Sequence, residues 1–222
     1  MKTKFLAAAA AIALAVAAPS FANASIIGIS DISDLGATDT IDWGQLTGSF
    51  TTPQAVTSGL GQAATVSGDS TIARIDQSGG WTGNFANGEH LLWSQGSNST
   101  ITLNFLNPVS AVGAYIQADY YGQFIAELIA SNGDSLGSFA LFGNSDANPG
   151  TALFLGLKST SADIAQVQFH LNQGNGGTDF AIGTVSLNGS AVPEPATWAM
   201  MISGFAMAGM ALRSRRLVPV KA

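Results

Sequence analysis

Thr100-Ile101-Thr102-Leu103-Asn104-Phe105 alternates polar and apolar side chains along its whole length. Because successive side chains of a β-strand point to opposite faces, this segment predicts a strand with one face in a core and the other in solvent. Residues 166–171 repeat the alternation. Both segments therefore predict half-buried strands of an antiparallel sheet.

The chain between its two ends predicts strands and turns rather than helices. Further strands are expected at 63–66, 71–75, 111–117, 124–130, 135–141, 152–157 and 180–187. Turn-forming residues separate the strands, notably Asn107-Pro108, 131–134, 148–150 and 173–177. The stretch 47–61, rich in Gly, Ser and Thr, predicts a loop or an edge region. This pattern predicts an all-β fold, an antiparallel β-sandwich of jelly-roll type.

The first 24 residues predict a secretory signal peptide. Lys2 and Lys4 precede an apolar run over 5–18, and small residues follow at the expected cleavage site. The residues that define this cleavage are Ala22, Ala24 and Ser25. Export through the Sec machinery would leave a mature chain beginning at Ser25, with a β-sandwich ectodomain over residues 25–190.

The C-terminal end, residues 191–222, has three parts. Pro193-Glu194-Pro195 comes first, and its prolines hold the backbone extended and accessible. An uncharged apolar segment follows at about 196–212, which as a helix would reach about 25 Å and predicts a single transmembrane helix. The basic tail, 213–222, carries the arginines that predict a cytoplasmic end for this helix: Arg213, Arg215 and Arg216. The N-terminal domain is therefore expected outside the cytoplasm.

These C-terminal features resemble the sorting signal of the PEP-CTERM family in its PEPxxWA form. The resemblance rests on Pro193-Glu194-Pro195, Trp198, the glycine-bearing apolar segment and the arginine cluster, in that order. It implies that an exosortase, a membrane enzyme, recognises this motif and processes the exported chain near it. The precursor would be anchored in the inner membrane, and the processed protein would lie at the cell surface or outside the cell.

The ectodomain also resembles β-sandwich domains that commonly precede PEP-CTERM tails. Short segments at 38–46, 107–116, 155–157 and 179–182 carry this second resemblance. Relatives often have an acidic pair where this chain has Gly183-Thr184. The resemblance implies a bacterial envelope or extracellular-matrix protein with a structural or adhesive role in association with exopolysaccharide.

Composition excludes several classes of function. Within residues 25–192 only Arg74 and Lys158 are basic, whereas all of the fourteen Asp and Glu residues except Glu194 lie there. Such an acidic domain repels nucleic acid, so no nucleic-acid partner is expected. The chain has no cysteine, which excludes disulfides, thiolate zinc sites and cysteine nucleophiles.

The sequence offers little for catalysis. Gly133-Asp134-Ser135-Leu136-Gly137 matches the G-x-S-x-G pattern, and an esterase using Ser135 is a remote alternative. The stretch instead joins two predicted strands, as a hairpin turn does. The chain is therefore expected not to be an enzyme. No cofactor or metal site is predicted, although four carboxylates could attract calcium: Asp31, Asp34, Asp39 and Asp42.

Aromatic residues suggest a second class of function, carbohydrate binding. Trp81 and Trp93 flank a loop rich in Gly and Asn, and Asp119-Tyr120-Tyr121 falls at an expected turn. Exposed rings can stack on sugars while Asp supplies hydrogen bonds, but Trp and Tyr also fill sandwich cores. The alternative to a structural or adhesive protein is thus a carbohydrate-binding module that contacts polysaccharide through these five residues.

Overall fold

The structure is a computed structural model that describes residues 25–78, 80–95, 99–174, 179–189 and 201–207. The predicted signal peptide, Pro193-Glu194-Pro195, Trp198 and the arginine cluster lie outside these residues. Of the expected transmembrane segment, residues 201–207 are described, and they are helical and exposed. Among the described residues, no helix has the length and apolar character needed to cross a membrane.

Strands form nearly all regular structure between residues 25 and 189. In chain order the elements are β1 (Ile26–Ile29), α1 (Ile32–Leu35), β2 (Asp39–Ile41), the 3₁₀ helix η1 (Trp43–Gln45), β3 (Ser49–Phe50), β4 (Gln54–Thr57), β5 (Ala63–Gly68), β6 (Ile72–Asp76), β7 (His90–Ser94), β8 (Thr100–Ala118), β9 (Gly122–Ser131), β10 (Ser135–Ser145), β11 (Leu153–Ser159), β12 (Ile164–Gly174), β13 (Phe180–Ile182) and β14 (Val185–Gly189). The predicted all-β class is confirmed, while the jelly-roll assignment stays a prediction.

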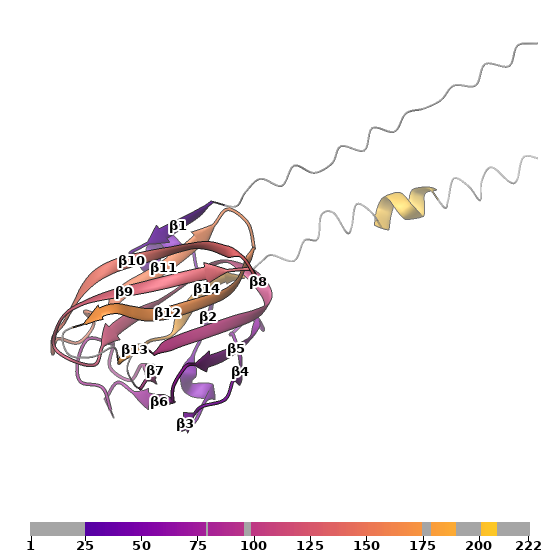
Figure 1. Ribbon diagram of the computed structural model, residues 1–222. Helices are drawn as coiled ribbons and strands as arrows, with labels where there is room; N and C mark the ends of the chain where they lie inside the picture. The colour runs from indigo at the N-terminus through magenta and orange to yellow at the C-terminus, as the bar shows by residue number, and fades with distance from the viewer. Residues whose placement is uncertain (1–24, 79, 96–98, 175–178, 190–200, 208–222) are drawn as a thin grey trace, which may run out of the picture.

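The long strand β8 connects the two layers of the sandwich (Figure 1). Its first half pairs with β12 and β5, in a layer that continues to β9, β10 and β4. Its second half pairs with β11, β13 and β14, in a layer that includes β1, β2, β7, β6 and β3. Every strand pairing within the described part of the chain is antiparallel, so β8 enters one layer, turns over at one end of the sandwich and returns in the other.

The predicted turn at Asn107-Pro108 is wrong, because β8 runs through it. Pairing with β12 skips from Asn104 to Val109, and pairing with β5 stops at Phe105. Residues 106–108 are exposed. Pro108 has no N–H to donate, but at the crossing between layers no ladder bond is required of it. The proline therefore marks where the strand changes layers rather than where it ends.

The alternate side chains of the strands that point inward form the core between the two layers. In β9, Phe124, Ala126, Leu128 and Ala130 are buried, while the residues between them are half-buried on the outer face. The same inward set recurs in β8 and β12, where Leu103, Val167 and Phe169 have no exposed surface. Each such large side chain contributes about 1.5–3 kcal/mol through burial. The alternating segments at 100–105 and 166–171 thus supply core residues, as predicted.

The expected strand at 180–187 is divided into β13 and β14 at Gly183-Thr184. The Gly183 carbonyl accepts a hydrogen bond from Trp43 Nε1 at 2.8 Å, and the Thr184 amide donates to Glu89 Oε1 at 3.1 Å. A Cβ at Gly183 would collide with the Glu89 carboxylate. Side chains from distant segments therefore take over the backbone bonds that a continuous ladder would use.

Several short elements were not predicted as strands or helices from the sequence. Residues 47–61, expected as a loop or an edge region, contain the short edge strands β3 and β4, in agreement with the second alternative, and β7 was not predicted. The single-turn helix α1 begins at Asp31, whose side chain accepts from the Ser33 amide at 2.9 Å. It ends at Gly36, whose φ of 69° lies in the left-handed region. Elements of two to five residues are too short to show a period.

Candidate functional site

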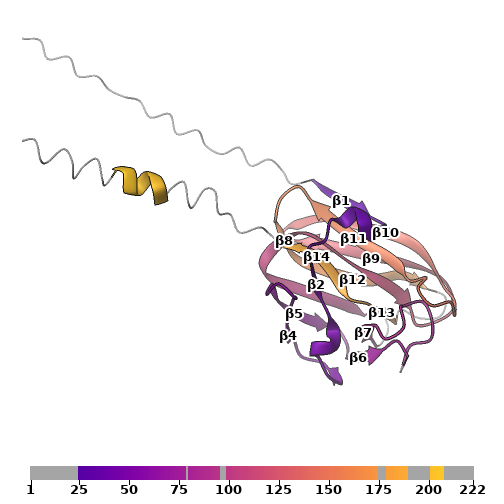
Figure 2. The same ribbon diagram turned by 180° about the vertical axis from the view of Figure 1, so that it is seen from behind.

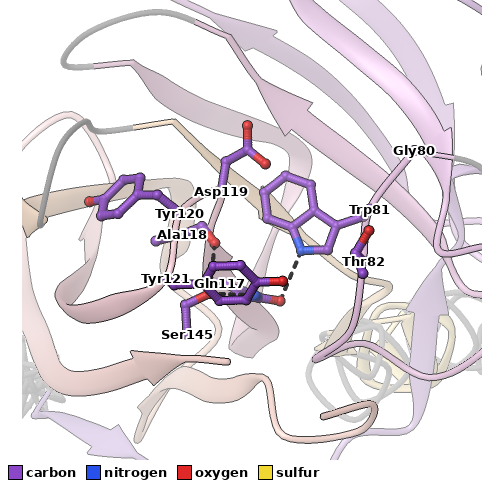
Figure 3. Close-up of a pocket in the computed structure, with 9 residues that line it drawn as sticks. All are labelled: Gly80, Trp81, Thr82, Gln117, Ala118, Asp119, Tyr120, Tyr121 and Ser145. Carbon is purple, nitrogen blue, oxygen red and sulfur yellow. Dashed lines mark hydrogen bonds between the residues drawn. The ribbon is translucent and has the colours of Figure 1, made fainter. Parts of the chain in front are cut away.

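A pocket of about 180 Å³ lies where β8 ends and the chain turns into β9. The loop between β6 and β7 forms one wall and the last residue of β10 forms another (Figure 3). We call this region the pocket end. Its lining residues are Gly80, Trp81, Thr82, Gln117, Ala118, Asp119, Tyr120, Tyr121 and Ser145.

Buried hydrogen bonds hold one side of the pocket rigid. Trp81 Nε1 donates to Gln117 Oε1 at 2.9 Å, Gln117 Nε2 donates to Ser145 Oγ at 2.6 Å, and Ser145 Oγ donates to the Ala118 carbonyl at 3.2 Å (Figure 3). Trp81 is only 4% exposed, and its ring meets Phe85 and Trp93 edge-on. The Trp81 ring is therefore part of the protein's interior.

Tyr121 supplies the exposed aromatic ring of the pocket. Its side chain is 63% exposed and lines the pocket together with Gln117 and Ser145 (Figure 3). Tyr120 points away from it and packs against the main core, where its hydroxyl is buried without a hydrogen-bond partner among the described residues. An exposed tyrosine beside polar groups is a surface on which a planar or ring-shaped ligand can stack.

Asp119 makes the pocket end acidic. Its amide donates to the Asp179 carbonyl at 2.9 Å, which brings the two aspartates together. Desolvation of its carboxyl, and then the negative charge of Asp179, raise the pKa of Asp119 above its ordinary value. A second negative charge would be unfavourable here, so the pocket favours a neutral or positively charged ligand.

The five residues expected at a glycan site divide between pocket and core. Four of them line one pocket: Trp81, Asp119, Tyr120 and Tyr121. Trp93 packs against Trp81 and does not line the pocket. Thr82, Gln117 and Ser145 also line the pocket and were not predicted from the sequence. Gln117 could have been noticed, because it is a lone polar residue in an apolar stretch, Ala111 to Ala118.

Ser135 lies in a strand-turn-strand hairpin. It begins β10 opposite Ser131 of β9, and Gly133 in the turn has a φ of 105°. The nucleophile of a G-x-S-x-G hydrolase sits instead between a strand and a helix. The residues that follow Ser135 continue as β10, so the local geometry differs from that of this enzyme class.

Each histidine is held by carboxylates away from the pocket. His90 begins β7, and its Nδ1 is 2.7 Å from Asp42 Oδ1. Partial burial would raise the pKa of Asp42, but hydrogen bonds from His90 and the Gly44 amide lower it below its ordinary value. His170 Nε2 is 2.8 Å from Asn172 Oδ1 and 3.3 Å from Glu127 Oε2, on the outer face of β12.

The four carboxylates considered for calcium are spread over separate local structures. Asp31 caps α1, Asp39 accepts from the Thr40 and Leu60 amides, and Asp42 accepts from Gly44 and His90. Asp34 lies within α1. No group of three or more His, Asp or Glu side chains suited to a metal ion occurs in the described ranges. Calcium binding remains a prediction without a structural site.

The comparisons place a sorting signal on this β-sandwich protein. Residues 191–216 match the family model of the PEP-CTERM protein-sorting motif. Residues 191–216 therefore carry a PEP-CTERM sorting motif, as predicted from Pro193-Glu194-Pro195 and Trp198. A search among curated proteins finds no match. A solved structure of TmCBM61 in complex with beta-1,4-galactotriose is similar at 12% identity and a TM-score of 0.31, over 57% of this chain and 84% of that chain.

Proposed function

We propose that this chain is an exported bacterial envelope protein that an exosortase sorts and processes through its C-terminal motif. The matched motif at residues 191–216 is the observation that carries this proposal. In the proposed sequence of events, the signal peptide directs export and the apolar segment at about 196–212 holds the precursor in the inner membrane. Processing near Pro193-Glu194-Pro195 then sends the sandwich to the cell surface or the extracellular matrix.

The proposed role of the sandwich is structural or adhesive, in association with exopolysaccharide. Two features support binding rather than catalysis: the pocket end has a rigid frame, and its exposed ring belongs to Tyr121. Its acidity argues for a neutral or positively charged glycan over an acidic one, since Asp119 and Asp179 would repel a polyanion. The chain would have no enzymatic activity of its own.

A carbohydrate-binding module is the second candidate function. Its specific support is that four of the five predicted glycan-contact residues line one pocket. This candidate requires saturable binding to a defined glycan, whereas a purely structural component does not. An esterase using Ser135 has no comparable support.

Sorting can be tested by the intact mass and the location of the protein in its native cells. Pro193, Glu194 and Pro195 would all be replaced by alanine, and Thr197→Ala would serve as the control within the same motif. We expect the unchanged chain and the control to be shortened at the C-terminus and to leave the inner membrane, while the triple variant stays full length there. Full-length protein in the membrane for all three would refute processing.

Glycan binding can be tested on immobilised exopolysaccharide from the same cells. Tyr121→Ala should weaken retention, since it removes the exposed ring of the pocket. The matched control is Phe142→Ala, because Phe142 is 83% exposed on β10 but does not line the pocket. Equal retention of both variants and the unchanged protein would exclude the pocket as a glycan site.

A further inference from the structure

The described sandwich begins and ends at the same end of the molecule (Figures 1 and 2). Its last residue, Gly189, pairs with Val109 at the start of the second half of β8. Its first residue, Ser25, accepts a hydrogen bond from the Thr160 amide at 3.3 Å, beyond the end of β11. The sorting tail therefore leaves the sandwich beside the bend of β8.

Two exposed leucines lie at this place. Leu106, in the bend of β8, is 75% exposed, and Leu60, in the turn between β4 and β5, is 77% exposed. Gln62 Nε2 donates to the Asn107 carbonyl at 2.7 Å and joins the turn to the bend. We define the exit corner as residues 58–62, 106–110 and 187–189.

Hydrogen bonds hold Leu60 outward at the exit corner. Asp39 accepts from the Leu60 amide at 3.0 Å and from the Ser58 hydroxyl, and Asp39 is itself the β2 partner of Leu187 in β14. The Gly59 amide donates to the Thr40 carbonyl at 3.0 Å, and the Gly61 amide to the Ser58 carbonyl at 3.0 Å. The turn is thus fixed directly beside the strand from which the tail departs.

The linker between the sandwich and the apolar segment is short, so the exit corner must stay close to the membrane. Six residues, 190–195, separate Gly189 from the start of the apolar segment, and fully extended they span at most about 20 Å. The second half of β8, from Val109 to Ala118, is about 30 Å long. The tether is therefore shorter than the sandwich, so the sandwich cannot stand on its pocket end, and the exit corner stays within about 20 Å of the bilayer.

We propose that the exit corner is a membrane-contact surface in the precursor, with Leu60 and Leu106 inserted into the interfacial region of the bilayer. The proposal rests on the proposed retention of the precursor by its C-terminal segment. Aliphatic side chains gain free energy when they leave water for the interface, and the short tether holds them at that depth. Two leucines alone give only weak attachment, so processing of the tail still releases the domain.

This arrangement orients the pocket outward. Tyr121 follows Ala118, at the opposite end of the second half of β8 from Val109. With the exit corner on the bilayer, the pocket end faces away from the membrane, about a strand length from its surface. A pocket ligand could thus be reached while the protein is still anchored.

The full-length chain lends itself to a site-specific test because it contains no cysteine. Single-cysteine variants L60C and L106C would carry a polarity-sensitive fluorophore, and the protein would be reconstituted in phosphatidylcholine vesicles. The matched controls are F142C and Y121C, exposed positions on β10 and at the pocket end. We expect a blue shift and quenching by nitroxide-labelled lipid at both leucine positions and neither effect at the controls.

Flotation of the same vesicles separates this inference from the proposed function. If the chain does not float with the vesicles, membrane retention fails and the contact fails with it. If the chain floats but the probes at positions 60 and 106 stay in water, retention stands and the contact is refuted. A blue shift at these positions in detergent, without nitroxide quenching in vesicles, would assign the surface to a second copy of the chain and also overturn the proposal.

Discussion

The pocket end and the exit corner both present an exposed apolar side chain on a fixed frame, but the frames differ. At the pocket end, Trp81, Gln117 and Ser145 come from three distant segments, and the bonds between them are buried. At the exit corner, Asp39 holds a neighbouring turn through bonds that are exposed or partly buried. The first frame is therefore part of the protein's interior, whereas the second is a surface turn fixed by Asp39 of β2.

Removing the buried ring should have the largest effect. Trp81→Ala leaves a cavity and leaves Gln117 Oε1 without its hydrogen-bond donor, so we expect a loss of about 3–5 kcal/mol in the free energy of unfolding. Tyr121→Ala at the same end should change it by no more than about 0.5 kcal/mol. Urea denaturation followed by circular dichroism measures both. Similar losses of stability in the two variants would contradict the assignment of Trp81 to the interior and of Tyr121 to the surface.

A substitution in β8 midway between the pocket end and the exit corner should destabilise the whole sandwich. A Cβ at Gly113 would lie 2.8 Å from Gly156 Cα and 2.9 Å from the Leu155 carbonyl oxygen, which are backbone atoms of β11. Gly113→Ala should therefore cost about 1–3 kcal/mol by forcing β8 and β11 apart. Gly189→Ala is the control, because nothing lies within 4 Å of its added Cβ. A thermal midpoint equal to that of the control would contradict this close approach.

Loosening the turn should have a smaller and local effect. Asp39→Ala removes the acceptor for the Ser58 hydroxyl and the Leu60 amide, at an expected cost of about 1–2 kcal/mol. Hydrogen exchange should become faster at residues 58–61 and stay unchanged at 117–121. Asp134→Ala, in the exposed turn between β9 and β10, is the control. Faster exchange at both ends would show that the surface frame of the exit corner is coupled to the interior frame of the pocket end.

The smallest expected effect is a change in pH dependence at Glu89. Burial raises the pKa of the Glu89 carboxyl above its ordinary value of 4.5, although hydrogen bonds from the Thr184 and Ala86 amides oppose this. The folded state therefore favours the protonated form. This contribution to stability is complete below the unfolded-state pKa and is lost as pH rises through the folded-state pKa.

Glu89→Gln removes that titration. Relative to the variant, the unchanged protein should lose free energy of unfolding as pH rises past 4.5. Urea midpoints from about pH 4 to about pH 7 measure the difference, in which the other carboxylates cancel because both proteins contain them. If the unchanged protein instead gained free energy of unfolding relative to Glu89→Gln as pH rises, the hydrogen bonds would outweigh burial and the pKa of Glu89 would be lowered.

Particular residues show where prediction from the sequence succeeded. The alternation at 100–105 survives in β8 because its apolar face has one core to enter, and a shift of one residue would expose all of it. Gly133-Asp134 forms the predicted turn between β9 and β10 because glycine readily adopts the left-handed backbone. The sorting motif was identified from the sequence because its recognition depends on the order of residues.

The failures have equally specific causes. Asn107-Pro108 was expected to end a strand, since only the fold shows that β8 changes layers there. Gly183-Thr184 was expected to continue one, because nothing nearby in the sequence indicates that Glu89 and Trp43 bind its backbone. The sequence predicted both Trp81 and Tyr121 as glycan contacts and could not tell the buried ring from the exposed one. Trp81 is buried because it binds partners such as Gln117, which is 36 residues away in the chain.

The sequence by itself determined the all-β class, the sorting motif and the acidity of the domain, because alternation, residue order and net charge are local or additive properties. Tertiary structure alone decided that β8 joins the two layers, that Trp81 is interior while Tyr121 is exposed, and that Leu60 and Leu106 lie at the same end of the sandwich as Gly189, the last residue of β14. Each of these depends on which distant segments pair across the sheet. Burial and proximity are relations between such segments, and no single stretch of sequence contains them.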